Sequence, residues 1–196
     1  MSDAPSNKRG RRAVVILASG EAAKAADRLR SRFDPEWFER VPPHVSVIEP
    51  FAPGEIGPDE EIARRMIEAA SAAAPFDLEL GGPDAFIAPA LILYLSVIDD
   101  RPVRDLQARM QRALGVAAPK QRFVPHLTVG RAHSQEGLSI ALSALKAELA
   151  SRPECAPPLA FPVRAVHLIG EDPETGVYSR LASGPLGRPA RGAAAN

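Results

Sequence analysis

The sequence predicts an α+β protein that is bilobal, with two pseudo-symmetric lobes around a central cleft. Each lobe is expected to hold an antiparallel sheet with flanking helices. Strand and helix patterns alternate along the chain, and the order strand, helix, strand, helix, strand, strand fits both of its halves. A five-residue motif, Pro-His-aliphatic-hydroxyl-Val, occurs at 43–47 and again at 125–129, in the second strand of each half. Because the motif and the element order repeat together, an internal duplication is favoured over accidental alternation.

The first half places two helices among its strands. We expect a strand at 14–19, a helix at 21–33, a strand at 44–49, a helix at 58–74, and strands at 76–80 and 85–88. Pro58 and the acidic residues 59–61 mark a helix start, since proline suits the first turn and carboxylates favour the positive end of the helix dipole. The Gly-Gly-Pro sequence at 81–83 predicts a turn. Trp37 and Phe38 either cap the cleft or pack as a hydrophobic staple.

The second half repeats this order of elements. We expect a strand at 91–98, a helix at 101–114, a strand at 126–131, a helix at 135–150, and strands at 162–169 and 177–181. Gly115 follows the first of these helices, at the position where glycine commonly ends a helix. Each half therefore offers one strand that begins with a histidine.

These elements define one domain with two short ends. Residues 1–11 are expected to form a disordered leader, 12–184 a single domain duplicated as about 12–89 and 90–184, and 185–196 a flexible tail. The apolar run 13–18 is too short for the core of a signal peptide, and no stretch is long enough to span a membrane. With Cys155 as the single cysteine, a cytoplasmic protein is expected, as a monomer without an obligate protein partner.

The charge of the chain restricts its ligands. Lys and Arg total 24, Asp and Glu total 24, and the formal net charge is +0. No global field attracts nucleic acid or an anionic membrane, so recognition of a phosphate must be local. The balance favours a short oligonucleotide, a nucleotide or a small cyclic phosphodiester over long duplex RNA, because extended phosphate contacts need several cations.

The repeated motif brings together imidazoles and hydroxyls. Side chains alternate along a strand, so His44 shares a face with Ser46, and His126 shares a face with Thr128. Imidazoles accept and donate protons near neutral pH, which suits a general base and a general acid. The hydroxyls can donate to phosphate oxygens that gain charge in the transition state. Two such pairs are suited to a phosphodiester.

The two segments resemble the 2H phosphoesterase superfamily, whose motif is His-x-Thr/Ser followed by an apolar residue, twice. Pro-His-Val-Ser-Val-Ile-Glu-Pro-Phe at 43–51 is similar to the first motif of its small bacterial branch, the 2'-5' RNA ligases or RNA 2',3'-cyclic phosphodiesterases. Phe-Val-Pro-His-Leu-Thr-Val-Gly-Arg at 123–131 is similar to the second. The resemblance covers about residues 12–184. It implies a bilobal hydrolase with a central cleft, an RNA terminus or nucleotide as substrate, and reversible RNA ligase activity as a further possibility.

Carried over by position, the resemblance assigns roles to four residues. His44 and His126 would be the catalytic pair, and Ser46 and Thr128 would bind the phosphate. Ser46 stands where threonine is commoner, but it keeps the hydroxyl. The family chemistry needs no metal and no cofactor, and no metal-ligand spacing accompanies either histidine. Which histidine is the acid is left open.

Other residues are weaker candidates. Arg122, in the loop before His126, is the first choice among the cations near the second motif, ahead of Lys120 and Arg131. Three aromatic residues are candidates for stacking on a nucleobase, or else for the core: Phe51, Phe123 and Tyr94. His133 and His167 lack the hydroxyl two positions later and carry no assigned role.

Two alternatives to an enzyme remain open at this stage. One is a relative that binds RNA or nucleotides in the same cleft without catalysis, and the other is a structural α+β protein with no cleft. The distance between the two imidazoles in the fold distinguishes the structural protein, in which they can lie far apart, from the enzyme and the binding relative.

Overall fold

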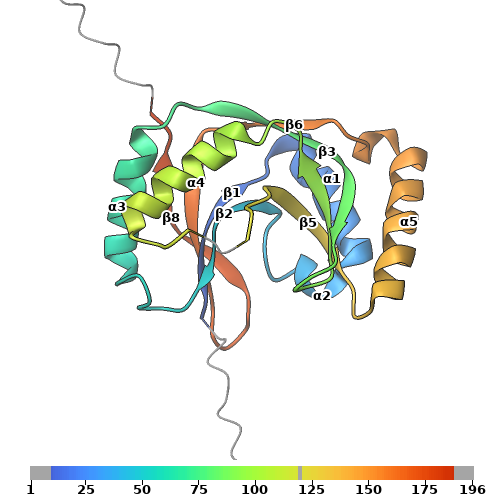
Figure 1. Ribbon diagram of the computed structural model, residues 1–196, viewed down its shortest axis with the longest axis horizontal. Coiled ribbons are helices and arrows are strands. Elements are labelled where there is room, and N and C mark those ends of the chain that lie inside the picture. Colours follow the sequence, from blue (N-terminus) through green and yellow to red (C-terminus); the bar gives the residue numbers. More distant parts are fainter. Residues whose placement is uncertain (1–9, 119–120, 188–196) are drawn as a thin grey trace, which may run out of the picture.

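The computed structural model describes residues 10–118 and 121–187. Within them, eight strands form one sheet and five α-helices pack beside it (Figure 1). Every recorded strand pairing is antiparallel. The α+β class expected from the alternating patterns is confirmed.

The strands are β1 (Arg12–Leu17), β2 (His44–Phe51), β3 (Phe76–Phe86), β4 (Ile92–Val97), β5 (His126–Arg131), β6 (Leu159–Val163), β7 (Ala165–Glu171) and β8 (Tyr178–Pro185). The helices are α1 (Gly20–Phe33), α2 (Pro35–Phe38), α3 (Asp59–Ser71), α4 (Arg101–Leu114) and α5 (Gln135–Ser151), with a short 3₁₀ turn at Pro153–Cys155. Helix α4 ends as expected, with Gly115 in the left-handed region at φ 70°.

The strand order is β6-β3-β4-β5-β2-β1-β7-β8, so β2 and β5, which carry the two histidine motifs, are central neighbours. The two halves of the chain do not build separate sheets. Strand β3, from the first half, pairs with β4 and β6, while β7, from the second half, pairs with β1. Each half of the sheet therefore contains a strand from the other half of the chain, and the expected division near residue 90 does not follow the two ends of the sheet.

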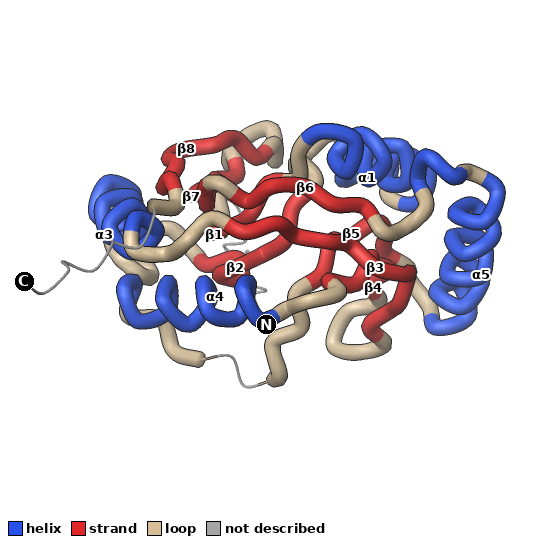
Figure 2. Tube along the Cα trace, turned by 90° about the horizontal axis from the view of Figure 1, so that it is seen from above, coloured by secondary structure: helices blue, strands red, loops and turns tan. Residues whose placement is uncertain are grey.

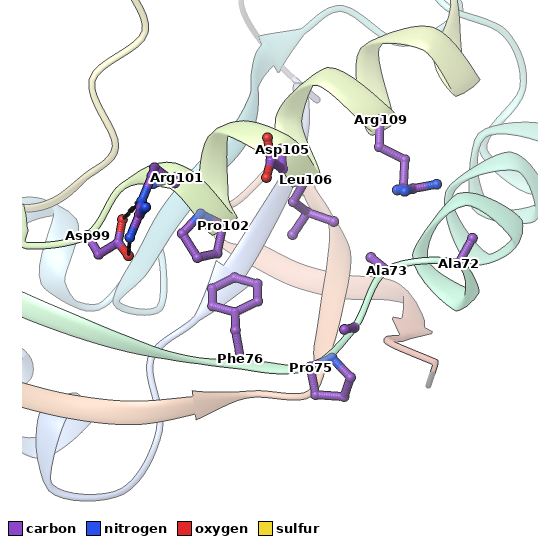
Figure 3. A pocket seen from close by; sticks show the side chains of 11 residues that line it. Ala72, Ala73, Pro75, Phe76, Asp99, Arg101, Pro102, Asp105, Leu106 and Arg109 are labelled. Carbon is purple, nitrogen blue, oxygen red and sulfur yellow. Dashed lines mark hydrogen bonds and ion pairs between the residues drawn. The ribbon is translucent and has the colours of Figure 1, made fainter. Parts of the chain in front are cut away.

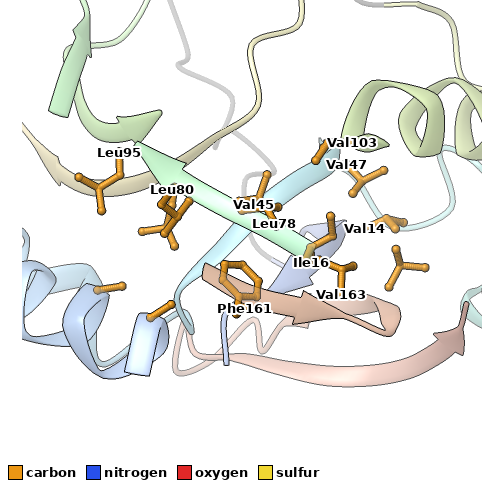
Figure 4. Packing of buried hydrophobic residues seen from close by; sticks show 14 of the residues in the cluster. Val14, Ile16, Val45, Val47, Leu78, Leu80, Leu95, Val103, Phe161 and Val163 are labelled. Carbon is orange, nitrogen blue, oxygen red and sulfur yellow. The ribbon is translucent and has the colours of Figure 1, made fainter. Parts of the chain in front are cut away.

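Helices gather at the two ends of this sheet. Figure 2 shows α3 and α4 at the end that holds β1, β2, β7 and β8, and α1 and α5 at the other. They cover one large apolar core, in which Val14 and Ile16 of β1 and Val45 and Val47 of β2 are at most 1% exposed (Figure 4). Because alternate strand residues point to opposite faces, burying these leaves the neighbouring residues on the other face.

Three details of the chain differ from the sequence prediction. Residues 76–86 form a single strand, and the Gly-Gly-Pro sequence is an irregularity within it, where the register shifts between the pairs Leu80–Val97 and Pro83–Leu95. Glycine inside a strand often marks such a bulge. The expected strand 162–169 is divided at Arg164 into β6 and β7.

The ordered domain also extends further at both ends than expected. The backbone N–H of Arg11 donates to Glu171, and that of Leu186, which is 8% exposed, donates to Arg164. Residues 10–11 and 185–187 therefore belong to the fold, and the remainder of the expected leader and tail lies outside the described residues.

Candidate active site

The two histidine motifs face one another across the centre of the sheet. Val45 of β2 pairs with Leu127 of β5 in antiparallel register. Extending that register by one residue in each direction places His44 opposite Thr128 and His126 opposite Ser46. Facing residues of antiparallel strands point to the same side. All four lie on what we call the histidine face, while Val45 and Leu127 are 0% exposed on the opposite, core face.

Both imidazoles are held by the same local hydrogen bond. Nδ1 of His44 lies 2.7 Å from the carbonyl oxygen of Pro42, and Nδ1 of His126 lies 2.8 Å from that of Val124. A carbonyl only accepts, so Nδ1 carries the proton in each ring. The Nε2 atom is left to accept a proton when the ring is neutral, or to donate one when it is charged.

Two aromatic rings pack around His126. The Phe86 ring meets it edge-on with centroids 4.9 Å apart, and the Tyr94 centroid lies 5.1 Å away. Phe86 and Tyr94 also stack on each other at 4.3 Å, and the Tyr94 hydroxyl donates to Asp84. Tyr94 is only 5% exposed, so its ring supports the imidazole and is not open to a nucleobase. The sequence prediction did not include Phe86 in the site. Phe86 lies on β3, which pairs with β4, and β4 in turn pairs with β5, so only the fold brings it near His126.

Two arginine charges act on His44, whereas aromatic rings pack on His126. The charges of Arg30, on α1, and Arg131, at the end of β5, both act on His44. The Arg131 guanidinium lies 3.9 Å from the centroid of the Trp37 ring and 3.8 Å from Asp34. Trp37 thus contacts Arg131, and it also packs on a small second core that contains Val15 and Val41. Of the two roles predicted for Trp37, these contacts favour packing over capping of the cleft.

Arg30 is buried by these contacts. It is 3% exposed, and its guanidinium donates to the carbonyl oxygens of Trp37 and Val41 and pairs with Asp27. It fastens the loop that leads into β2. Sequence reasoning missed it because nothing distinguishes it from the other arginines of α1.

The two histidines differ electrostatically. Burial lowers the pKa of His44 to about 4, and the charges of Arg30, His126 and Arg131 act in the same direction. Burial also lowers the pKa of His126, although the hydrogen bond to the Val124 carbonyl and, to a smaller extent, the carboxylate of Glu49 oppose that change. His44 is therefore neutral at pH 7, and His126 has the neighbour that favours its protonated form.

Tyr94 and Arg131 apart, the weaker sequence candidates among the described residues do not contact either imidazole. Arg122 is close enough to Asp100, before α4, to help lower the pKa of that carboxyl group, and it does not figure among the charges acting on either catalytic candidate. Phe51 is 5% exposed within the main core, and Phe123 packs against the same core. These positions suit packing better than stacking on a base. Lys120 lies outside the described residues.

The remaining two histidines have separate surroundings. His133 is exposed beyond the end of β5. His167, on β7, is paired in register with Val15 and bonds through Nδ1 to the Ser183 hydroxyl at 2.9 Å.

Two surface cavities flank α4. The larger, about 490 Å³, lies between the end of α3 and the start of α4, and the ion pair of Asp99 and Arg101 stands at its rim (Figure 3). The second, about 470 Å³, lies between β2 and the C-terminal half of α4, and Glu49 is among its walls. Glu49 therefore lines this second cavity and also exerts its charge on His126.

The family model described as the 2'-5' RNA ligase superfamily matches residues 18–174 of the chain. The chain belongs to the 2'-5' RNA ligase superfamily. Its similar relatives include a protein of Halalkalibacterium halodurans named as a candidate phosphoesterase, 30% identical over 135 residues, which are 68% of this chain and 77% of the relative. A Bacillus cereus protein of the same description is 31% identical over 118 residues, 60% of this chain and 67% of its own.

Solved structures with low sequence identity share the fold. The TT0787 protein of Thermus thermophilus matches with a TM-score of 0.59 at 18% identity, over 90% of this chain and 97% of that one. LigT of Escherichia coli in complex with 3'-AMP matches with a TM-score of 0.60 at 15% identity, over 92% and 100%. Membership in the superfamily supports phosphoesterase activity.

The described residues contain neither a membrane-spanning helix nor a cluster of metal ligands. No helix among them is long and apolar enough to cross a membrane. Nor do residues 10–118 and 121–187 contain a group of three or more His, Cys, Asp or Glu side chains placed to hold a metal ion.

Proposed function

We propose that this phosphoesterase hydrolyses a 2',3'-cyclic phosphate, or a 2'-5' linkage, at RNA ends or in nucleotides, by acid-base catalysis with two histidines and without a metal. The observation that carries the proposal is the central register, which sets each imidazole opposite the hydroxyl of the other motif. A phosphate between them would meet two proton-transfer groups and two hydroxyl donors. That set matches the needs of an in-line displacement at phosphorus.

The electrostatic difference between the histidines gives each a role. His44 is neutral, with Nε2 free to accept, so it removes a proton from the attacking water. The water oxygen bonds to phosphorus as the bond from phosphorus to the leaving sugar oxygen breaks. His126, whose protonated form is stabilised by Glu49 against the effect of burial, donates a proton to that oxygen. In the reverse direction, with a sugar hydroxyl as the attacking group, the roles exchange and a phosphodiester forms.

The other polar groups would stabilise the charge on the phosphate. The Ser46 and Thr128 hydroxyls donate to the non-bridging oxygens, and Arg131, whose charge acts on His44, supplies the positive potential. Each donor aimed at developing charge is worth about 2.7–4 kcal/mol in comparable sites. Because the chain has a formal net charge of +0, these local groups have to provide the attraction for the phosphate. LigT, bound to 3'-AMP, provides support from a protein of the same fold for a nucleotide substrate.

The test is hydrolysis of 2',3'-cyclic nucleotides and 2'-5' dinucleotides by the wild type, His44→Ala and His126→Ala. Each variant should lose about 10²–10⁴-fold in kcat/KM, the usual contribution of a general acid or base. A chelator should have no effect on the wild type. Full activity in either folded variant contradicts the proposal. Tight binding without turnover across the panel would instead identify a nucleotide-binding relative.

A further inference from the structure

A pocket of about 470 Å³ lies beside β2, against the C-terminal half of α4, and we call it the β2–α4 pocket. Its volume is in the range of sites for small organic ligands. Phe51, Ile56 and Leu114 provide apolar walls. Helix α4 and strand β2, which enclose it, lie side by side in the fold (Figure 2).

The polar side chains of the pocket can bind donors but carry no positive charge. Two glutamines, Gln107 and Gln111, line it from successive turns of α4, and two glutamates, Glu49 and Glu55, line it from the other side. Among the described residues 10–118 and 121–187, no lysine or arginine lines it. A phosphate is therefore not the expected occupant, since carboxylates repel it.

Gln107 is the most informative of these residues. It is only 8% exposed, but its amide is not one of the fully buried polar groups that lack a partner in the described residues, so the amide is open to the pocket. An amide that faces a pocket is available to hydrogen-bond a ligand. Glu49 is also unengaged by any described side chain, whereas Glu55 already accepts from the Ala52 backbone.

The pocket is adjacent to the proposed reaction centre. Because His126, the first residue of β5, stands opposite Ser46, β2 continues past the start of β5, and residues 47–51 have no β5 partner. Glu49 follows Ser46 by three residues, along a stretch where β2 bulges against β1, so it lies less than about 10 Å further along the strand. Glu49 lines the pocket and its charge also acts on His126. A nucleotide with its phosphate at the histidines could reach the pocket with its base over this distance.

We propose that the β2–α4 pocket binds the nucleobase of the substrate, and that guanine is the preferred base. Guanine presents two adjacent N–H donors on its Watson–Crick edge, which match the two oxygens of the Glu49 carboxylate, and further acceptors for the amides of Gln107 and Gln111. Uracil offers a single donor there. The inference deepens the proposed function by naming the group attached to the phosphate, and it rests on that function.

The experiment measures two quantities for wild type, Gln107→Met and Gln111→Met. The first is the dissociation constant of guanosine 2'-monophosphate, by calorimetry, which does not require turnover. The second is kcat/KM for the four 2',3'-cyclic mononucleotides and for ribose 2',3'-cyclic phosphate, which has no base. Gln135→Met, on an exposed position at the start of α5, is the matched control.

The wild type should prefer the guanine nucleotide by about 5-fold or more, the discrimination typical of one good bidentate contact. Gln107→Met should reduce this preference and weaken guanosine 2'-monophosphate binding several-fold, because one of the contacts to the base is lost. Its kcat/KM for the base-free substrate should stay at the wild-type value, and Gln135→Met should match the wild type in every measurement. Unchanged binding and base preference in both pocket variants overturns the inference, as does a wild type that prefers uracil. If nothing is hydrolysed but the variants weaken nucleotide binding, the proposed function fails and the pocket assignment stands.

Discussion

At the scale of single residues, the two motifs are alike in structure and unlike in charge. Each histidine bonds through Nδ1 to the carbonyl two residues before it. Yet the charges of Arg30 and Arg131 act on His44, whereas His126 is packed by two aromatic rings and influenced by the charge of Glu49. The sequence motif predicts the similarity of the two histidine segments, because the hydrogen bond they share is formed within a few residues of the chain. The difference depends on α1, β3 and the end of β5, which no spacing in the sequence relates to the motifs.

Replacing Glu49 with glutamine should lower the pKa of His126, because the carboxylate that favours its charged form is removed. If His126 is the general acid, the alkaline limb of the kcat/KM profile moves to lower pH, and activity at pH 7 and above decreases. The measurement is the pH profile, together with an NMR titration of the imidazole. A shift of the acidic limb instead, with increased activity at low pH, would exchange the roles of the two histidines.

His44 should also make the fold sensitive to acid. Its pKa is about 4 when folded, below the 6.5 of a free histidine, so the folded state binds fewer protons than the unfolded state between those values. Stability is thus lost as pH falls from 6.5 towards 4, and no such effect operates above 6.5. At pH 5 the cost is about 2 kcal/mol.

His44→Gln should remove this cost while keeping a side-chain donor. Urea unfolding at pH 7 and pH 5 measures the difference: the wild type should lose about 2 kcal/mol more than the variant over that interval. Equal losses would show that His44 ionises normally in the folded protein.

At the scale of elements, the position of β5 depends on a close approach to α1. A Cβ atom on Gly130 would come within 2.9 Å of the backbone oxygen of Phe33, the last residue of α1. Only glycine allows this distance, and the same strand carries His126 and Thr128. The sequence placed both elements correctly, within a few residues, but gave no indication that they meet here.

Gly130→Ala should therefore destabilise the protein by about 1–3 kcal/mol, the usual cost of overpacking against rigid backbone. Hydrolysis should fall with it, because β5 must shift. Thermal unfolding measures the first effect. Gly82→Ala, in β3, is the control, because its new Cβ would have nothing within 4 Å and should leave the melting temperature nearly unchanged. Equal effects of the two substitutions would contradict the close packing.

At the scale of the whole molecule, the two ends of the sheet are tied together by exchanged strands. β3 joins the end built mostly from the second half of the chain, and β7 joins the end that holds β1 and β2. One apolar core includes residues from both ends. Neither half can complete its own end of the sheet without the other.

Unfolding should consequently be a single cooperative transition. Calorimetry of the whole chain should show one peak, with calorimetric and van't Hoff enthalpies equal. Circular dichroism and the fluorescence of Trp37, which packs on the second core, should report the same midpoint. Two separated transitions would instead indicate lobes that fold independently.

The sequence by itself determined the α+β class, most of the strands and helices, and which face of each motif strand carries the imidazole and hydroxyl, because these follow from local periodicity. The bulge within β3, the division at Arg164 and the packed ends depend on strand partners, and the sequence prediction missed them. Only the tertiary structure decided that β2 and β5 are neighbours in register, that Arg131 rather than Arg122 acts on His44, and that Glu49 connects His126 with a pocket. These are contacts between segments far apart in the chain, and their energies depend on burial and distance, which residue patterns do not specify.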